Sequence, residues 1–131
     1  VEPGTEITAE MRRATIVVDA LLGTGMQGGA RGRAAELIAE INTGFPDARV
    51  VAVDVPSGIE SDEAETKGLV ARADLTVTFT ALKPAHALAP NCDRMGKVVV
   101  GRIGTPEEML AEVRQEVIEP GVHFPALFAP R

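Results

Sequence analysis

Short runs of β-branched residues that are apolar at almost every position restrict the fold of this chain more than any other feature. Such runs occupy residues 16–18, 50–53 and 98–100. Strands that are apolar on both faces are typical of parallel sheets with helices on either side. Residues 75–79 alternate apolar and polar side chains instead, so we expect that strand nearer an edge of the sheet or beside a polar cavity. The sequence therefore predicts four strands, at residues 15–18, 49–53, 75–79 and 97–100.

A helix is predicted between the first two strands, over residues 33–42. Four apolar side chains recur there at the spacing of one helical face: Ala34, Leu37, Ile38 and Ile41. Gly44 is placed to end this helix, and Thr105 can cap the start of a last one. Strand, helix and strand in this order are typical of a right-handed crossover. We therefore predict an α/β fold, Rossmann-like, with three αβα layers and a mostly parallel sheet that this chain supplies only in part.

The composition excludes several classes of partner. The chain has 131 residues, sufficient for one domain, and its net charge of −6 offers no positive surface for a phosphate backbone. It has four Phe but no Trp or Tyr, so it also lacks aromatic platforms for stacked bases. No apolar run reaches the roughly 20 residues that span a bilayer. We expect no nucleic acid and no membrane as partners. The single cysteine, Cys92, indicates a reducing, cytoplasmic compartment and an incidental rather than reactive thiol.

A glycine-rich segment follows Asp19 at the end of the first predicted strand. Its residues are Gly23, Thr24, Gly25, Met26, Gln27, Gly28 and Gly29. The four glycines permit positive φ angles and a close approach of a ligand to the backbone, and successive amides ahead of a helix can bind an anion. The segment matches neither the P-loop pattern nor the dinucleotide fingerprint. A strand-to-helix connection that binds no ligand is the alternative.

A second polar segment follows the next strand and begins at Asp54. Pro56 favours extended backbone before it, and a tight turn at Ser57 and Gly58 would then present the carboxylate and the hydroxyl. Ligands of open α/β sheets bind beyond the carboxyl ends of the strands, so Asp19, Asp54 and Ser57 should face one crevice. Their oxygens can hold a hard cation, and one carboxylate can transfer a proton. The alternative is that both aspartates only cap backbone amides.

Other polar residues are weaker candidates. Lys83 could reach a phosphate, although a solvated loop lysine is the more frequent case. His86 lies far in the sequence from His123, with no further ligand at suitable spacing, so a zinc site is not expected. Residues 60–65 are predicted to form a solvated acidic loop.

Four segments, in this order, resemble the C-terminal half of the NAD(P)H-hydrate epimerase domain, also called the YjeF N-terminal domain. They are Asp19-Ala20-Leu21-Leu22-Gly23-Thr24-Gly25, Val53-Asp54-Val55-Pro56-Ser57-Gly58, Ala73-Asp74-Leu75-Thr76-Val77-Thr78-Phe79 with Lys83-Pro84, and Gly96-Lys97-Val98-Val99-Val100 leading to Ile103-Gly104-Thr105-Pro106. Each segment alone is weakly specific, whereas the ordered set is specific. The resemblance implies that residues 1–118 form the C-terminal half of such a domain and that residues 119–131 form a linker or tail towards a dehydratase domain.

The resemblance also implies an isomerase that interconverts the R and S forms of NADHX and NADPHX, nicotinamide cofactors damaged by hydration at ring carbon 6. By position, Asp19 and Ser57 would help to bind a potassium ion, and residues 23–29 would contact the hydrated dinucleotide. Asp54 would bind the substrate at its reacting end, and we assign the proton transfer to this residue. Members of the family are commonly homodimers, and in bacterial fusions an ADP- or ATP-dependent NAD(P)HX dehydratase domain follows.

One motif of the family does not occur in this sequence. Family members carry a Gly-Asn-Asn-Gly-Gly-Asp-Gly loop ahead of these segments, and no such loop precedes Asp19. We therefore expect catalysis to need the N-terminal half of the domain. The alternative function is a non-catalytic binding or dimerisation module. The presence of Asp19, Asp54 and Ser57 together disfavours it, because a scaffold needs no polar crevice.

Overall fold

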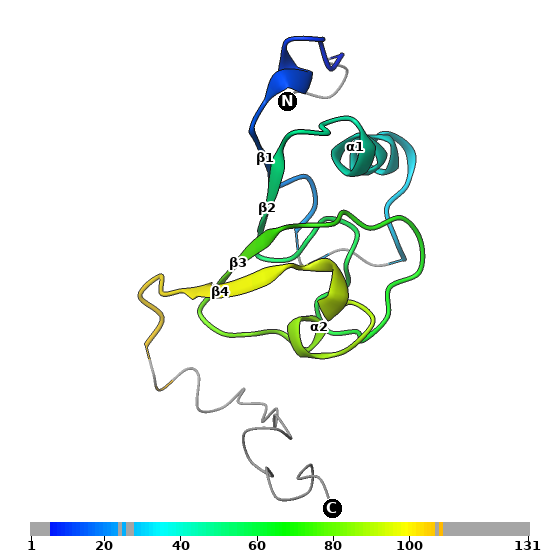
Figure 1. Ribbon diagram of the computed structural model, residues 1–131. Coiled ribbons are helices and arrows are strands. Elements are labelled where there is room, and N and C mark those ends of the chain that lie inside the picture. The colour runs from blue at the N-terminus through cyan, green and yellow to red at the C-terminus, as the bar shows by residue number, and fades with distance from the viewer. Residues whose placement is uncertain (1–5, 24, 26–27, 107, 109–131) are drawn as a thin grey trace, which may run out of the picture.

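The computed structural model describes residues 6–23, 25, 28–106 and 108, where helices separate the strands except between the second and the third (Figure 1). The α-helices are α1 (Gly32–Thr43) and α2 (Pro84–Ala87), and the 3-10 helices are η1 (Met11–Arg13) and η2 (Cys92–Arg94). The strands are β1 (Ile16–Asp19), β2 (Arg49–Val53), β3 (Leu75–Phe79) and β4 (Lys97–Gly101). All four predicted strands are confirmed, with limits shifted by one residue at most.

The strands form one sheet in the order β1-β2-β3-β4, and every neighbouring pair is parallel. The predicted α/β class with a parallel sheet is therefore confirmed. β3 lies between β2 and β4, so the expectation of an edge position for this strand is wrong. Thr76 and Thr78 of β3 are fully buried, and the Thr76 hydroxyl donates to the Met95 carbonyl at 2.7 Å. Polar side chains inside a strand thus mark internal hydrogen bonds here rather than solvent.

α1 connects β1 to β2 and covers one face of the sheet. Its two buried residues, Ile38 and Ile41, belong to a core cluster with Val50 of β2. The helix ends at Gly44 as predicted, where the Gly44 amide donates to the Glu40 carbonyl at 2.7 Å. The φ of Gly44 is −88°, which any residue can adopt. Glycine is required there for space instead, because a Cβ would lie 2.8 Å from the Glu40 carbonyl oxygen.

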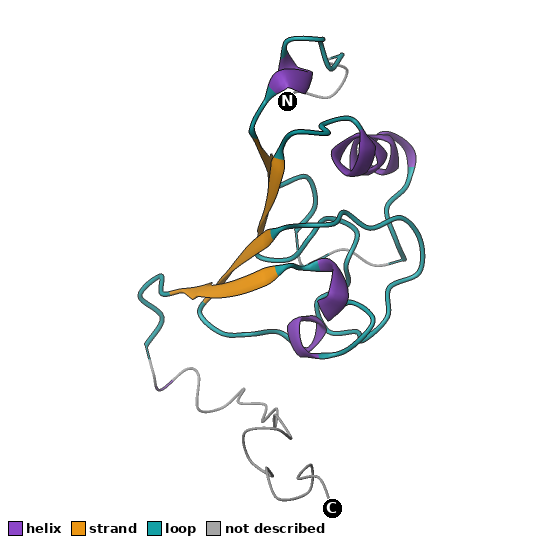
Figure 2. Cartoon of the chain, viewed as in Figure 1, coloured by secondary structure: helices purple, strands orange, loops and turns teal. Residues whose placement is uncertain are grey.

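Both α-helices lie on the same side of the sheet (Figure 2). A second core cluster occupies that side near α2 and consists of Val55, Ile59, Val70, Ala85 and Met95. On the opposite face, Ile16 and Val18 are 61% and 60% exposed. The described residues therefore build two of the three predicted layers, and this part of the chain supplies no helix to the other face.

The predicted last helix falls largely outside the described residues. Thr105, Pro106 and Glu108 are described, whereas residues 107 and 109–131, with the predicted tail from residue 119, are not. The Thr105 hydroxyl lies 2.8 Å from the Thr80 hydroxyl. Within the described part, no helix has the length and apolar character needed to cross a membrane.

Candidate active site

The carboxyl ends of β1, β2 and β3 meet at one edge of the sheet, because these strands are parallel neighbours. Asp19 is the last residue of β1 and pairs in register with Ala52 of β2. Asp54 directly follows β2, and Thr80 directly follows β3. The two aspartates therefore stand at adjacent strand ends, as the sequence predicts.

Asp19 and Ser57 form a buried pair that joins the loops after β1 and β2, and each residue is 1% exposed. The Ser57 hydroxyl donates to Asp19 Oδ1 at 2.5 Å, and the Ser57 amide donates to Asp19 Oδ2 at 2.7 Å. The hydroxyl oxygen also accepts a hydrogen bond from the Leu22 amide at 3.0 Å. Asp19 thus caps a backbone amide, which was the alternative interpretation. Ser57 faces this carboxylate rather than an open crevice.

The turn after β2 holds Asp54 in a backbone conformation that few residues other than glycine adopt. The φ of Asp54 is 69°, in the left-handed region. The predicted tight turn is confirmed, because the Ile59 amide donates to the Pro56 carbonyl at 3.0 Å and Gly58 has a φ of 95°. A strained residue of this kind persists only where its surroundings fix it, and such residues concentrate at functional sites.

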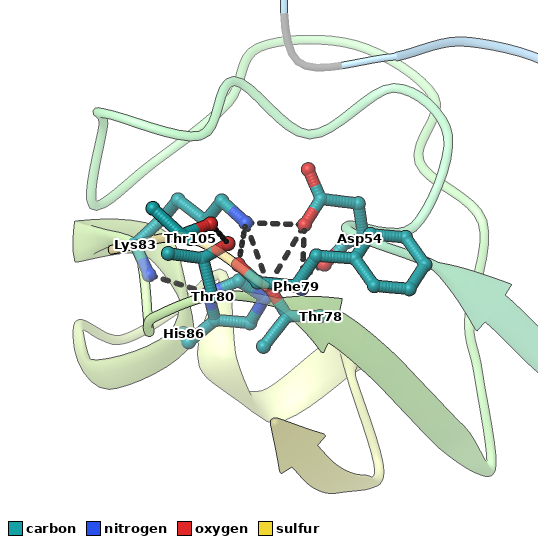
Figure 3. Close-up of polar contacts among 7 residues, drawn as sticks. All are labelled: Asp54, Thr78, Phe79, Thr80, Lys83, His86 and Thr105. Carbon is teal, nitrogen blue, oxygen red and sulfur yellow. Dashed lines mark hydrogen bonds and ion pairs between the residues drawn. The ribbon is translucent and has the colours of Figure 1, made fainter. Parts of the chain in front are cut away.

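One carboxylate oxygen of Asp54 is held by donors from the end of β3 and the loop that follows (Figure 3). Oδ1 accepts hydrogen bonds from the Thr78 hydroxyl at 2.8 Å and the Phe79 amide at 3.3 Å, and it forms an ion pair with the Lys83 ammonium. Lys83 also donates to the Thr78 hydroxyl at 2.8 Å and to the Phe79 carbonyl at 3.2 Å. Oδ2 of Asp54 has no hydrogen-bond partner among the described residues, so it is the oxygen left for a ligand.

Two opposing effects act on the pKa of Asp54. Burial raises the pKa of this carboxyl, whereas the hydrogen bonds from Lys83, Thr78 and the Phe79 amide lower it. The hydrogen bonds prevail, so the pKa of Asp54 lies below its usual range. The group is therefore ionised at neutral pH, which is the form that can accept a proton.

His86 links the backbone of Asp54 to the backbone of Lys83. The Lys83 amide donates to Nδ1 of His86 at 2.9 Å, which assigns the ring proton to Nε2. Nε2 then donates to the Asp54 carbonyl at 2.8 Å. Because His86 is 7% exposed and both of its nitrogens are engaged with the main chain, it is a fixed structural link at this site.

The glycine-rich segment conforms to prediction in part. Thr24, Met26 and Gln27 lie outside the described residues. Gly28 and Gly29 have the expected positive φ angles, 80° and 77°. Gly23 and Gly25 do not use the freedom that glycine gives, since they have no positive φ and no atom within 4 Å of an added Cβ. Neither conformation nor space therefore demands glycine at those two positions.

The second part of this segment contacts the acidic loop after β2. The Gly28 amide donates to the Glu60 carboxylate at 3.1 Å. An added Cβ on Gly29 would lie 2.5 Å from the Lys67 carbonyl oxygen. Asp62, Glu63 and Glu65 are exposed, as predicted for a solvated loop, whereas the Glu60 carboxylate contacts the glycine-rich segment.

The potassium ion that the resemblance implies can be tested against the chemistry of Asp19 and Ser57. Asp19 is buried and has no cationic partner among the described residues, and a buried carboxylate is costly unless a cation or several donors compensate it. Both side chains offer oxygen, the ligand atom that hard cations take. They are too few for a complete site, since no group of three or more His, Cys, Asp or Glu side chains in the described part could hold a metal ion. The two residues fit part of a potassium site.

Lys83 and His86 are the site residues that sequence reasoning missed. Lys83 was expected to be solvated, and His86 was considered only as a zinc ligand. A signal was present, because both follow the carboxyl end of a strand, as Asp19 and Asp54 do. Thr78 was the second signal, since a polar residue near the end of a buried strand indicates a polar neighbour inside the protein.

A parallel sheet with carboxylates and a glycine-rich segment at its carboxyl edge defines an α/β domain of the Rossmann-like class, in which ligands bind beyond the carboxyl ends of the strands. Comparison with protein families is more specific. The chain belongs to the family described as YjeF-related protein N-terminus, whose model matches residues 2–85.

Several curated relatives have related names. A bifunctional NAD(P)H-hydrate repair enzyme Nnr of Thermanaerovibrio acidaminovorans is 38% identical over 116 residues, which cover 88% of this chain and 22% of the relative. An NAD(P)H-hydrate epimerase of Pirellula staleyi is 38% identical over 82% of this chain and 46% of the relative. One of Limosilactobacillus reuteri is 41% identical over 75% of this chain and 45% of the relative. The chain thus spans less than half the length of these relatives.

Proposed function

We propose that the protein to which this chain belongs is an isomerase that interconverts R- and S-NAD(P)HX, and that this chain supplies its proton-transferring carboxylate. Two relatives named NAD(P)H-hydrate epimerase, at 38% and 41% identity, support the reaction. The observation that carries the proposal is Asp54 itself, ionised and held through Oδ1 with Oδ2 left open at the carboxyl edge of the sheet. The N-terminal part of the domain would complete the site.

The proposed chemistry needs no redox cofactor. The hydrated ring carbon is a carbinolamine, so its configuration can invert by loss and readdition of the hydroxyl or by opening and closing of the ring. Both routes move a proton near neutral pH, and in the ring-opening route an ionised carboxylate in the crevice can accept the hydroxyl proton and return it. Asp54 is the residue for this step because its Oδ1 is held by three donors while its Oδ2 has no partner among the described residues.

The glycine-rich segment, residues 23–29, would contact the dinucleotide through its backbone. The Gly28 amide is engaged by Glu60 at an exposed position, and an anionic group of the substrate can take the place of that carboxylate. Asp19 and Ser57 would hold a potassium ion, whose charge would balance the buried Asp19 carboxylate and favour anionic substrate nearby.

Further parts of the proposal concern the whole protein. Some relatives are named bifunctional repair enzymes, and in one of them the match to this chain covers 22% of the relative's length. These relatives support a fused ADP- or ATP-dependent NAD(P)HX dehydratase domain. We also propose a homodimer in the cytoplasm.

The experiment is an epimerisation assay of the full-length protein with one pure epimer of NADHX in potassium buffer, followed by chromatography of the R and S forms. Asp54→Asn should lower kcat by roughly 10²- to 10⁴-fold, the usual contribution of an acid–base residue. Asp62→Asn changes an exposed carboxylate in the loop after the turn and should leave the rate unchanged. Undiminished epimerisation by Asp54→Asn would refute the role of this residue. A folded wild-type protein that does not exceed the spontaneous rate would favour a non-catalytic binding module.

A further inference from the structure

We infer that Lys83 is a positioning residue for the proposed epimerisation, which fixes Oδ1 of Asp54 and leaves Oδ2 as the oxygen that exchanges a proton with the substrate. The reaction in this inference is the one under the proposed function, on which the inference rests. The positions of Lys83 and Asp54 come from the described contacts.

The position of the Lys83 ammonium is itself fixed. Nζ contacts three oxygens at once, those of the Asp54 carboxylate, the Thr78 hydroxyl and the Phe79 carbonyl. The Lys83 side chain is 24% exposed, so most of it is shielded from solvent. An ammonium group can donate three hydrogen bonds, and all three are used within the site. The ammonium therefore has no donor left for a substrate phosphate, the role that sequence alone left open.

The backbone on either side of the ion pair is also fixed. His86 binds the Lys83 amide and the Asp54 carbonyl, which ties the loop after β3 to the turn after β2. Asp54 and Thr80 both have left-handed conformations, with φ angles of 69° and 71°. Two strained non-glycine residues on adjacent strand ends indicate that the surrounding contacts define this geometry closely.

The asymmetry of the Asp54 carboxylate follows from these contacts. All three donors point to Oδ1, so the carboxylate cannot rotate without breaking them, and Oδ2 remains directed away from them. In the ring-opening route, Oδ2 would take the proton of the hydroxyl on ring carbon 6 while a C=O bond forms there and the bond from this carbon to the ring nitrogen breaks, leaving its electron pair on the nitrogen. The nitrogen then re-forms the bond on the other face of the carbonyl, and Oδ2 returns the proton to the same oxygen. No proton is consumed over the cycle, and Lys83 keeps its own proton throughout.

Removal of Lys83 should change the protonation of Asp54 in a defined direction. The titratable groups that contact Asp54 in the described structure are Lys83, from the loop after β3, and His86, from α2, which touches only the Asp54 carbonyl. Without the ammonium, burial of Asp54 is opposed only by Thr78 and the Phe79 amide, so the pKa of Asp54 must rise. Asp54 acts as a base only above its pKa. On acidification, the variant without the ammonium should therefore lose activity at a higher pH than the wild type does.

The test measures kcat/KM of the full-length protein against pH for Lys83→Met and Lys83→Arg, with the spontaneous rate subtracted. Lys83→Met should lose about 10-fold or more at pH 7, where Asp54 stays ionised, because Oδ1 is no longer held, and it should move the acidic limb up by about one pH unit or more. Lys83→Arg keeps a cation beside Oδ1 and should leave the acidic limb in place. Lys97→Met, at the exposed start of β4, is the matched control and should match the wild type.

A second measurement does not depend on turnover. The carboxyl carbon of Asp54 is titrated by NMR and assigned through its loss in Asp54→Asn. Suppose that the pKa of Asp54 is higher in Lys83→Met than in the wild type, but that the wild-type protein does not epimerise the substrate. This result would refute the proposed function and still support the positioning of Asp54 by Lys83. An unchanged titration and an unchanged pH profile in Lys83→Met would overturn the inference. If Lys83→Met does not fold, the pH profiles of Lys83→Arg and of the uncharged Lys83→Gln are compared instead. An acidic limb that moves equally far in both variants would overturn the inference.

Discussion

At the scale of a single residue, Gly96 shows how the backbone that leads into β3 restricts the residue type at the start of β4. It lies between η2 and β4 with a φ of 59°. A Cβ at this position would overlap the Asp74 and Ala73 carbonyl oxygens, where the chain enters β3. Backbone atoms cannot move aside as a flexible side chain can. Glycine is therefore required both by conformation and by space.

We predict that Gly96→Ala lowers the free energy of unfolding by roughly 2–4 kcal/mol, from left-handed strain together with the overlap. Urea unfolding of the full-length protein would measure it. Gly104→Ala is the matched control, because Gly104 has a φ of 87° but no atom within 4 Å of an added Cβ. It should cost only about 1 kcal/mol. Equal losses in the two variants would show that the approach to Asp74 is unimportant.

At the same scale, the candidate site shows which residues a sequence can reveal. Asp19, Asp54 and Ser57 were predictable, because each follows a recognisable strand and a parallel sheet brings such ends together. The direction of their side chains was not predictable. Ser57 pairs with Asp19 over 38 positions of sequence, and Lys83 reaches Asp54 over 29. Contacts of this range depend on register and on loop conformation, which local patterns do not encode.

At the scale of elements, the strands were predictable because β-branched runs are strong local signals. The place of β3 was not, since Thr76 and Thr78 look solvent-facing in sequence although both are buried. Their hydroxyls find internal acceptors at Met95 and Asp54. Alternation of apolar and polar residues reports exposure only where the polar groups have no partner inside the protein.

The junction between β2 and β3 offers a prediction about pH. Asp74 precedes β3, and its carboxylate accepts hydrogen bonds from the Val50 amide at 2.8 Å and from Arg49 at 2.8 Å. The Val50 amide first, and then Arg49, hold the pKa of Asp74 below its usual range. A carboxyl whose pKa is lower in the folded state stabilises the fold above its unfolded pKa, near 3.9. That contribution is lost as the pH falls through the lower, folded pKa.

The free energy of unfolding of the wild-type protein should therefore decline as the pH is lowered from 5 to 3. We predict a shallower decline for Asp74→Asn, which has lost the titrating group and is already less stable at pH 7. Urea unfolding at several pH values measures both effects. Asp47→Asn, at an exposed position before β2, should retain the wild-type slope. Part of the slope should remain in Asp74→Asn, because the pKa of Asp54 is also lowered. Identical slopes in Asp74→Asn and wild type would contradict the assignment.

At the scale of the whole molecule, the face of the sheet opposite α1 and α2 is apolar and continuous. Register places Val18 beside Val51, Val51 beside Leu75, and Val77 beside Val99. Parallel sheets are normally covered on both faces, whereas Val18 is 60% exposed and Val99 is 42% exposed in the described structure. The single-function relatives are more than twice as long as the segment that this chain matches. We expect the remainder of the YjeF-related domain to cover this face.

If this face is covered, a substitution at Val18 should destabilise the full-length protein, although Val18 is exposed in the described structure. In the full-length protein, Val18→Ser should lower the free energy of unfolding by about 2 kcal/mol, the loss expected for a buried valine rather than for an exposed one. Leu88→Ser, at a residue 44% exposed at the end of α2, is the matched control and should change stability by less than about 0.5 kcal/mol. A loss at Val18 no greater than at Leu88 would mean that the apolar face stays uncovered. The proposed site would then have to be completed from the loops at the carboxyl edge alone, because no second layer of helices would be present to carry further ligands towards Asp54.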